Sequence, residues 1–360
     1  MAAFFKVKSA YGDYEVAIEA GQFTSFLDPS TEQIVLADDF FAGGLQAAGH
    51  TVIPVTAHET TKSLDRIPEI VEALRRAGAS RKTTLVAVGG GVVQDVAGFV
   101  ATIYMRGLDW VYVPTTLLAM ADSCIGGKSS INVGPYKNLV GAFRPPQVVK
   151  IDPDLVSTLS VEQKVAGLCE AAKICFCLGE VPYRAYSALD AGVCSSVATL
   201  AAVIELSLAA KTRFIEIDEF DQSERLLLNF GHTFGHAIEA ASHFAISHGV
   251  AVGRGMLTAR RFGLGLGNVP VAGSQAEAMF AHVTELLAQV PDLPDAVRRL
   301  NLADLMEAFT SDKKHSRDAY VVIVLDGKGA VQRLVLPRDD RTTLRVSEAF
   351  AEVLASANVG

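Results

Sequence analysis

Strand-like and helix-like patterns alternate through the first 150 residues, and this alternation constrains the fold more than any other feature of the chain. Runs of strand character are separated by amphipathic segments such as residues 63–77, whose apolar residues recur at helical spacing. The strand-like runs cover residues 33–36, 51–55, 84–88 and 110–113. This order predicts a parallel, doubly wound α/β sheet.

The pattern changes near residues 152–153, and the rest of the chain is mostly helical in character. Helices are predicted over residues 161–178, 195–217, 227–242, 253–264 and 275–289, with one β pair at 319–324 and 331–336. A chain of 360 residues is longer than one hydrophobic core usually supports. We therefore predict an α/β domain over residues 1–155 and a mostly α-helical domain over residues 156–360.

Composition and charge exclude several classes of partner. The net charge is −8 and no basic stripe or tail is present, which argues against nucleic acid. The longest apolar run, residues 83–104, is interrupted by polar residues and glycines, so no membrane span is expected. The N-terminus lacks a signal-peptide pattern, and the five cysteines have no disulfide-like spacing, so we expect a cytoplasmic protein with free thiols.

A group of histidines indicates a metal site. His232 and His236 lie four residues apart, and His248 follows twelve residues later. On a helix, side chains at i and i+4 share a face, so two imidazoles at this spacing can bind one divalent metal. Spacing alone would assign both His232 and His236 to the metal. A carboxylate is still needed, because an open catalytic zinc site typically has three protein ligands.

Two turns of the predicted sheet have the composition of a phosphate-binding edge. Gly89-Gly90-Gly91 follow the strand at 84–88 and precede an apolar helix, where backbone N–H groups can approach a pyrophosphate. Tight packing without a ligand is the alternative. Thr115 and Thr116 end the next strand at the same edge of the sheet.

A lysine-containing segment follows these turns. Two glycines precede Lys128, and Lys137 is followed by Asn138. Ammonium and amide groups are suitable donors for a phosphate, so this segment could form an anion-binding cradle. A flexible surface loop is the alternative interpretation.

Several of these segments together resemble a known family. The strings GGGVVQDVAGF, YMRG, VPTTLLAMADSCIGGKSSIN, KNLVGAF and NFGHTFGHAIE are similar to those of the 3-dehydroquinate synthases and other sugar phosphate cyclases, over about residues 59–256. The resemblance implies an N-terminal Rossmann-like domain that binds NAD and a helical domain that binds Zn²⁺ or Co²⁺. It also implies a homodimer with the active site between the two domains.

The resemblance implies roles for individual residues. Glu170, in the segment GLCEAAK, would join His232 and His248 as metal ligands, which leaves His236 to act on the substrate. The implied NAD contacts are Asp38, Glu59 and Lys62 at the adenosine, Gly90, Gly91, Asp95, Thr115 and Thr116 at the pyrophosphate and ribose, and Asp122, Lys137 and Thr158 at the nicotinamide. The implied substrate and catalytic residues are Lys128, Asn138, Lys173, Lys211, Arg225, Asn229 and His236. Arg106 would reach the phosphate in the partner subunit, and either Lys313 or Lys314, here assigned to Lys314, would close over it.

The implied reaction forms 3-dehydroquinate and phosphate from 3-deoxy-D-arabino-heptulosonate 7-phosphate. It combines transient oxidation by NAD, β-elimination of phosphate, reduction and an intramolecular aldol closure. Arg225 indicates the substrate class, because its planar guanidinium is suited to a carboxylate. The alternative interpretation is an arginine on the protein surface.

Some positions depart from the family pattern. They are Gln94, Ser129 to Ile131, Ala171 and Ala172, and Val250. These departures indicate a divergent branch, so a secondary-metabolism cyclase for an amino analogue or for another sugar phosphate is a second hypothesis. A metal-dependent polyol dehydrogenase of the glycerol dehydrogenase type is a third.

Overall fold

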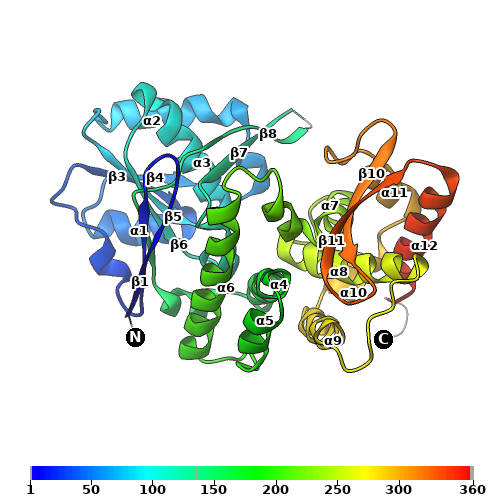
Figure 1. Ribbon diagram of the computed structural model, residues 1–360. Coiled ribbons are helices and arrows are strands. Elements are labelled where there is room, and N and C mark those ends of the chain that lie inside the picture. The colour runs from blue at the N-terminus through cyan, green and yellow to red at the C-terminus, as the bar shows by residue number, and fades with distance from the viewer. Residues whose placement is uncertain (1, 135, 357–360) are drawn as a thin grey trace. The chain divides into compact units, whose positions relative to one another are not determined.

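The computed structural model describes residues 2–134 and 136–356, and the chain divides into two compact units (Figure 1). The first unit contains Met1–Leu159 and Ser196–Phe220, and the second contains Ser160–Ser195 and Asp221–Gly360. Helix α6 (Val197–Ile217) therefore belongs to the first unit, although helices of the second unit precede it along the chain. The sequence-based prediction has one domain boundary at residue 155, so it does not include this return of the chain to the first unit.

The first unit is built on a mostly parallel seven-stranded sheet, in the order β1-β2-β9-β6-β5-β3-β4. Its strands are β1 (Ala2–Val7), β2 (Tyr14–Glu19), β3 (Gln33–Asp38), β4 (Val52–Val55), β5 (Thr84–Gly89), β6 (Trp110–Pro114) and β9 (Val148–Ile151). Its helices include α1 (Asp39–Ala47), α2 (Ile67–Arg76), α3 (Gly91–Ile103) and α6. Only β1 pairs antiparallel, with β2. The structure confirms the predicted parallel α/β sheet.

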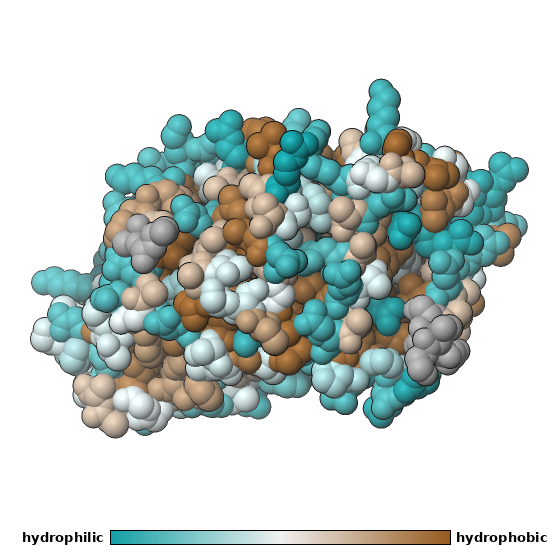
Figure 2. Space-filling model, turned by 90° about the horizontal axis from the view of Figure 1, so that it is seen from below, coloured by the Kyte–Doolittle hydropathy of each residue, from teal (hydrophilic) through white to brown (hydrophobic). Residues whose placement is uncertain are grey.

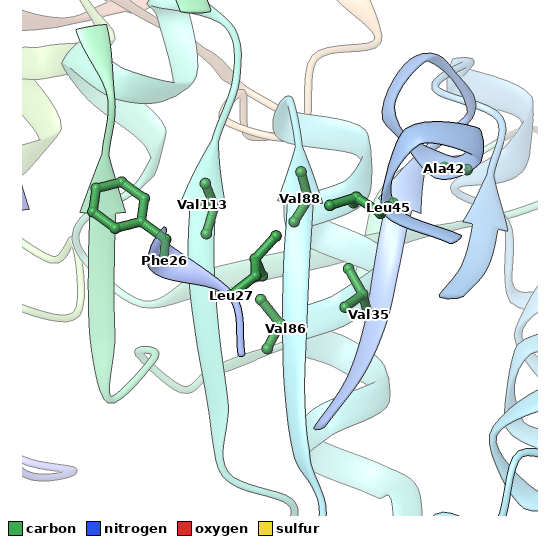
Figure 3. Close-up of a cluster of buried hydrophobic side chains, with 9 residues drawn as sticks. Phe26, Leu27, Val35, Ala42, Leu45, Val86, Val88 and Val113 are labelled. Carbon is green, nitrogen blue, oxygen red and sulfur yellow. The ribbon is translucent and has the colours of Figure 1, made fainter. Parts of the chain in front are cut away.

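The centre of this sheet is apolar because parallel strands are covered on both faces. Val86 and Val88 of β5 lie two residues apart, so their side chains point to the same face. Figure 3 shows Val86 and Val88 beside Val35 and Val113 from the flanking strands, with Leu27 of the same cluster next to them. This packing fixes where the strands end, and therefore where the turns that follow them lie.

The second unit is helical apart from one hairpin. Its helices are α4 (Val161–Leu178), α5 (Glu180–Ser187), α7 (His232–Ala241), α8 (His248–Gly265), α9 (Gln275–Ala288), α10 (Leu293–Arg298), α11 (Leu302–Thr310) and α12 (Asp340–Ser356). The hairpin pairs β10 (Ala319–Leu325) with β11 (Val331–Pro337), as predicted. Helix α8 packs against α4, α7, α9 and α12, and so lies at the centre of this unit.

Two sequence-based expectations are corrected. The helix predicted over residues 227–242 is interrupted: η7 (Glu224–Asn229) is a 3-10 helix, and α7 begins only at His232. The segment after Lys128 is not a flexible loop but an antiparallel hairpin of β7 (Lys128–Val133) and β8 (Tyr136–Phe143). Periodicity did not reveal it, because β8 is largely exposed and lacks an alternating pattern.

One face of the molecule has a surface of mixed hydropathy. Hydrophilic and hydrophobic residues are interspersed across the face in Figure 2. Among the described residues, no helix combines the length and apolar character that a membrane span requires.

Candidate functional site

A glycine positions the histidine-bearing helices of the second unit. Gly231 precedes α7 and has a φ of 80°, a left-handed conformation that favours glycine. A Cβ at Gly231 would lie 2.6 Å from Met256 Cγ and 2.8 Å from the carbonyl oxygen of Val252, both on α8. Glycine thus allows α7 to start in close contact with α8. As a result His232 and His248, the first residues of these two helices, come together.

Both of these imidazoles face one carboxylate oxygen. The Nε2 atoms of His232 and His248 lie 3.6 Å and 3.7 Å from Oε1 of Glu170 on α4. Their Nδ1 atoms face other acceptors: the carbonyl oxygen of Phe230 at 3.4 Å, and Oε2 of Glu239 at 3.2 Å. A carbonyl or carboxylate on one ring nitrogen is the usual way to orient a metal-binding imidazole.

Glu170 has the properties of a metal ligand. Its side chain is fully buried, and Oε2 forms an ion pair with Lys173 one turn along α4. Oε1 is buried without a hydrogen-bond partner. A buried, unsatisfied carboxylate oxygen is costly, and a divalent cation between it and the two Nε2 atoms would remove that cost. One carboxylate and two imidazoles match an open catalytic zinc site, so these residues fit the metal implied by the sequence.

His236 lies in the same cluster but has different neighbours. Its Nδ1 lies 3.5 Å from Oδ2 of Asp312 and 3.3 Å from Nζ of Lys314. One ring nitrogen from each of the three histidines falls within 4.8 Å of the others, so a three-histidine set is a geometric rival to the set with Glu170. The unsatisfied Oε1 favours Glu170, because a cation bound there would satisfy it.

Desolvation keeps the two helix α7 imidazoles neutral. It lowers the pKa of His232 well below the ordinary value and lowers that of His236 to about 4. The charge of Lys173 lowers the pKa of His232 further. Neutral imidazole is the form that binds a metal or accepts a proton.

Asp312 connects His236 to one of the two lysines considered above. Its Oδ2 lies 3.1 Å from Nζ of Lys314, and its Oδ1 accepts a hydrogen bond from the Lys314 backbone N–H at 2.8 Å. Lys313 is exposed. The geometry therefore favours Lys314. Sequence reasoning assigned no role to Asp312 or Glu239; their only local signal is their position in the Asp312-Lys313-Lys314 and NFGHTFGHAIE segments.

Arg225 and Asn229 belong to the 3-10 helix η7, which precedes α7. Arg225 is 3% exposed, so the surface-arginine interpretation is wrong. The amide of Asn229 donates to the carbonyl oxygen of Leu226 at 3.1 Å. A guanidinium has five N–H donors in a planar fork, so Arg225 can bind a substrate carboxylate in addition to its contacts within the protein.

In the first unit, the glycine-rich turn joins β5 to α3. A Cβ at Gly90 would lie 2.9 Å from Cγ2 of Thr116, so the two turns expected at this edge are in contact. No side chain caps the N-terminus of α3, which begins at Gly91. Its first N–H groups are therefore available to an anion, as the pyrophosphate of NAD requires.

A polar network continues from this turn to the β7–β8 hairpin. Lys62 Nζ lies 2.5 Å from Oδ2 of Asp95, while Oδ1 of Asp95 accepts from the backbone N–H of Ser130 at 2.9 Å. Glu59 Oε1 accepts from Asn132 Nδ2 at 2.9 Å and lies 3.6 Å from Lys137 Nζ.

The same hairpin holds Asn138. Its backbone N–H donates to Oδ1 of Asn132, and its Oδ1 accepts from the Ser130 hydroxyl at 2.9 Å. The structure therefore brings Glu59, Lys62, Asp95, Lys137 and Asn138 together through these contacts.

Other predicted cofactor and substrate residues make separate contacts. Asp38 caps α1 by accepting from the Phe40 N–H at 3.0 Å. Thr115 is buried, and its N–H donates to the carbonyl oxygen of Gly89. The Thr158 hydroxyl donates to the carbonyl oxygen of Leu155 at 2.7 Å, within its own 3-10 turn.

Two further cations of this unit differ in their surroundings. Lys128 is exposed, with Nζ 5.9 Å from the Phe143 ring centroid. Arg106 lies in a short turn and has a φ of 71°, next to Met105 with a φ of 47°. Positive φ at two successive non-glycine residues is uncommon and is often associated with functional sites.

Known proteins resemble the chain along most of its length. The sequence profile of the 3-dehydroquinate synthase N-terminal domain matches residues 52–166, and that of the C-terminal domain matches residues 167–315. A 3-dehydroquinate synthase of Alkaliphilus metalliredigens is 35% identical over 287 residues, which is 79% of each chain.

Solved structures share the fold. A 2-deoxy-scyllo-inosose synthase, complexed with carbaglucose-6-phosphate, NAD⁺ and Co²⁺, has a TM-score of 0.84 at 24% identity and covers 97% of this chain and 99% of its own. ValA, a 2-epi-5-epi-valiolone synthase of Streptomyces hygroscopicus with NAD⁺ and Zn²⁺ bound, has a TM-score of 0.74 at 22% identity, covering 98% and 99%.

Proposed function

Because the chain belongs to the 3-dehydroquinate synthase family, we propose that it is a sugar phosphate cyclase, a carbon–oxygen lyase dependent on NAD and a divalent metal. Its proposed reaction converts 3-deoxy-D-arabino-heptulosonate 7-phosphate to 3-dehydroquinate and phosphate. The observation that carries this proposal is the unsatisfied Glu170 Oε1, which faces the Nε2 atoms of His232 and His248.

The proposed cofactors are supported by the residues present. Glu170, His232 and His248 would hold Zn²⁺ or Co²⁺, the metals bound in the two cyclase structures. The uncapped N-terminus of α3, with Gly90 and Gly91, would hold the pyrophosphate of NAD. When bound, the metal supplies Lewis acidity at a substrate hydroxyl, and NAD supplies a reversible hydride acceptor.

The chain's own residues would bind the substrate and move its protons. Lys314 suits the phosphate, whereas Arg225 suits the carboxylate. His236 is neutral and can exchange a proton through Nε2 while its Nδ1 faces Asp312 and Lys314. The leaving phosphate can itself accept a proton during its elimination, so no additional strong base is required.

The proposal includes a cytoplasmic homodimer. The buried thiols of Cys124, Cys169 and Cys175 agree with a reducing compartment. In the family pattern, Arg106 contributes from the partner subunit, and its strained turn is consistent with a specialised role. Size-exclusion chromatography with light scattering would test the dimer.

A direct assay distinguishes the proposed activity from the two alternative functions. Purified, metal-loaded protein is incubated with NAD⁺ and a panel of 3-deoxy-D-arabino-heptulosonate 7-phosphate, its amino analogue, sedoheptulose 7-phosphate and glycerol. We expect phosphate release from the first compound without net change in NADH absorbance. Phosphate release only from another sugar phosphate would favour the secondary-metabolism cyclase. NADH accumulation with glycerol, and no phosphate release from any compound, would favour the polyol dehydrogenase.

Substitution of Arg225 tests the substrate class. Arg225→Met retains an extended side chain but removes the charge. We expect kcat/KM for the carboxylate-bearing substrate to fall by about 10- to 100-fold, or roughly 1.5–3 kcal/mol, as for a lost hydrogen bond to a charged group. Thermal unfolding of the variant controls for the loss of a buried guanidinium. An unchanged kcat/KM would argue that Arg225 does not bind the substrate carboxylate.

A further inference from the structure

A single turn of π-helix, η5 (Ala119–Ser123), is held in the first unit by side chains from two helices. The carbonyl oxygens of three successive residues at its C-terminal end, Ala121, Asp122 and Ser123, each accept a side-chain hydrogen bond. The donors are Ser207 Oγ at 2.7 Å, Lys211 Nζ at 2.6 Å and Gln94 Nε2 at 2.7 Å. Carbonyls at the end of a helix need such partners, and π-helical turns are frequent at functional sites.

Gln94 makes the most complete of these contacts. Its side chain is 5% exposed. The amide N–H donates to the Ser123 carbonyl, while Oε1 accepts from the Ser123 hydroxyl at 2.6 Å. The buried Gln94 and the partly buried Ser123 therefore form a reciprocal pair. Gln94 is also one of the positions at which the chain departs from the family pattern, and the function proposed above does not account for it.

The pair connects two parts of the proposed NAD site. Gln94 lies in the first turn of α3, three residues after Gly91. Ser123 follows Asp122, the residue assigned to the nicotinamide end. Asp122 Oδ1 lies 2.7 Å from Nζ of Lys211, whose side chain is buried. A change in the position of Ser123 would therefore change the positions of both the Asp122 carboxylate and the Lys211 ammonium.

We propose that Gln94 is a positioning residue of the cofactor site, which holds the Asp122–Lys211 ion pair in register with the glycine-rich turn through its hydrogen bonds to Ser123. The inference rests on the proposed function, because it takes Asp122 as part of the NAD site. It assigns to Gln94 an effect on cofactor affinity and turnover, beyond the stability that any buried hydrogen bond contributes.

The test compares Gln94→Leu and Ser123→Ala with a matched control in the same helix. Gln94→Leu removes both polar atoms with little change in volume, and Ser123→Ala removes only the hydroxyl. The control, Thr102→Val, removes a hydrogen bond of 2.8 Å to the Gly98 carbonyl and does not touch η5. NAD⁺ affinity is measured by calorimetry on the metal-loaded protein, alongside kcat and bound metal. The single tryptophan, Trp110 on β6, reports the fold of this unit by its emission.

We expect Gln94→Leu to raise the Kd for NAD⁺ about tenfold and Ser123→Ala about threefold, because a buried acceptor or donor loses its partner. The double variant should bind no more weakly than Gln94→Leu, since the two residues act as one unit. Thr102→Val should keep the wild-type Kd, and bound metal should not change in any variant.

Several outcomes would overturn the inference. A Gln94→Leu protein with wild-type Kd and kcat, with or without reduced thermal stability, would show a structural role only. If Gln94→Leu did not fold, Ser123→Ala would decide, and a wild-type Kd and kcat in that variant would overturn the proposal. If the wild-type protein bound no NAD⁺, the proposed function and this inference would both fail; NAD⁺ binding by the wild type with no effect of either substitution would overturn the inference alone.

Discussion

Replacing Glu170 with glutamine is expected to remove the bound metal and abolish turnover. Glutamine preserves the size of the side chain but lacks the negative charge that a divalent cation requires at the buried Oε1 position. Protein zinc sites bind with about 10–16 kcal/mol, so loss of one of three ligands should weaken metal binding by at least about two powers of ten. Metal content after dialysis, measured by inductively coupled plasma mass spectrometry, checks the result.

Two further variants separate metal loss from misfolding. Glu170→Gln also leaves the buried Lys173 ammonium without its ion-pair partner, which should destabilise the second unit. Adding Lys173→Met should recover thermal stability without recovering metal. Glu239→Gln should weaken metal binding by only about 10- to 100-fold, because Glu239 orients His248 and does not itself bind the metal. A Glu170→Gln protein that keeps one tightly bound metal would contradict the assignment.

Replacing His236 with glutamine is expected to give the opposite combination of results, with metal retained and turnover lost. The Nδ1 of His236 faces Asp312 and Lys314, which leaves Nε2 to exchange a proton with the substrate. Loss of a general acid–base group typically costs about 10²- to 10⁴-fold in rate, so we expect kcat to fall within that range. Stopped-flow detection of phosphate release, together with the metal content of the same sample, measures both quantities.

The matched control for His236 is His282, which lies elsewhere in the second unit. It lies on α9, and its Nε2 is 2.9 Å from the hydroxyl of Tyr186 on α5. His282→Gln should leave kcat and bound metal unchanged. If His236→Gln lost its metal as completely as Glu170→Gln, His236 would be a metal ligand too, which would contradict its assignment to the substrate.

Local patterns predicted several of the regular elements. The helix at 161–178 was predicted with its observed bounds, and the structure adds a capping box of Ser160 and Gln163 at its start. The strand at 84–88 was confirmed, with Gly89 added at its end, because a short apolar run before glycines is typical of a buried parallel strand. The break before His232 was missed, since the apolar period continues through Phe230, whereas the backbone leaves the helical conformation at Phe230, with a ψ of 127°, and at Gly231, with a φ of 80°.

Only part of the candidate site could be predicted from the sequence. Helical spacing identified the histidine cluster, but spacing alone paired His232 with His236, and the family pattern was needed to propose Glu170. Asp312 lies 76 residues from His236 along the chain (312 − 236 = 76), so only the packing of α7 against α11 reveals their contact. The Gln94–Ser123 pair is likewise a contact between separate elements, which no local pattern encodes.

Anomalous diffraction at the metal absorption edge, from crystals of the metal-loaded protein, tests the metal assignment most directly. We predict one anomalous peak, from a metal ion bound by an oxygen of Glu170 and by the Nε2 atoms of His232 and His248, with each metal–ligand distance at about 2.0–2.2 Å. His236 should not be a ligand. A peak coordinated by all three histidines, with Glu170 paired only to Lys173, would contradict the account.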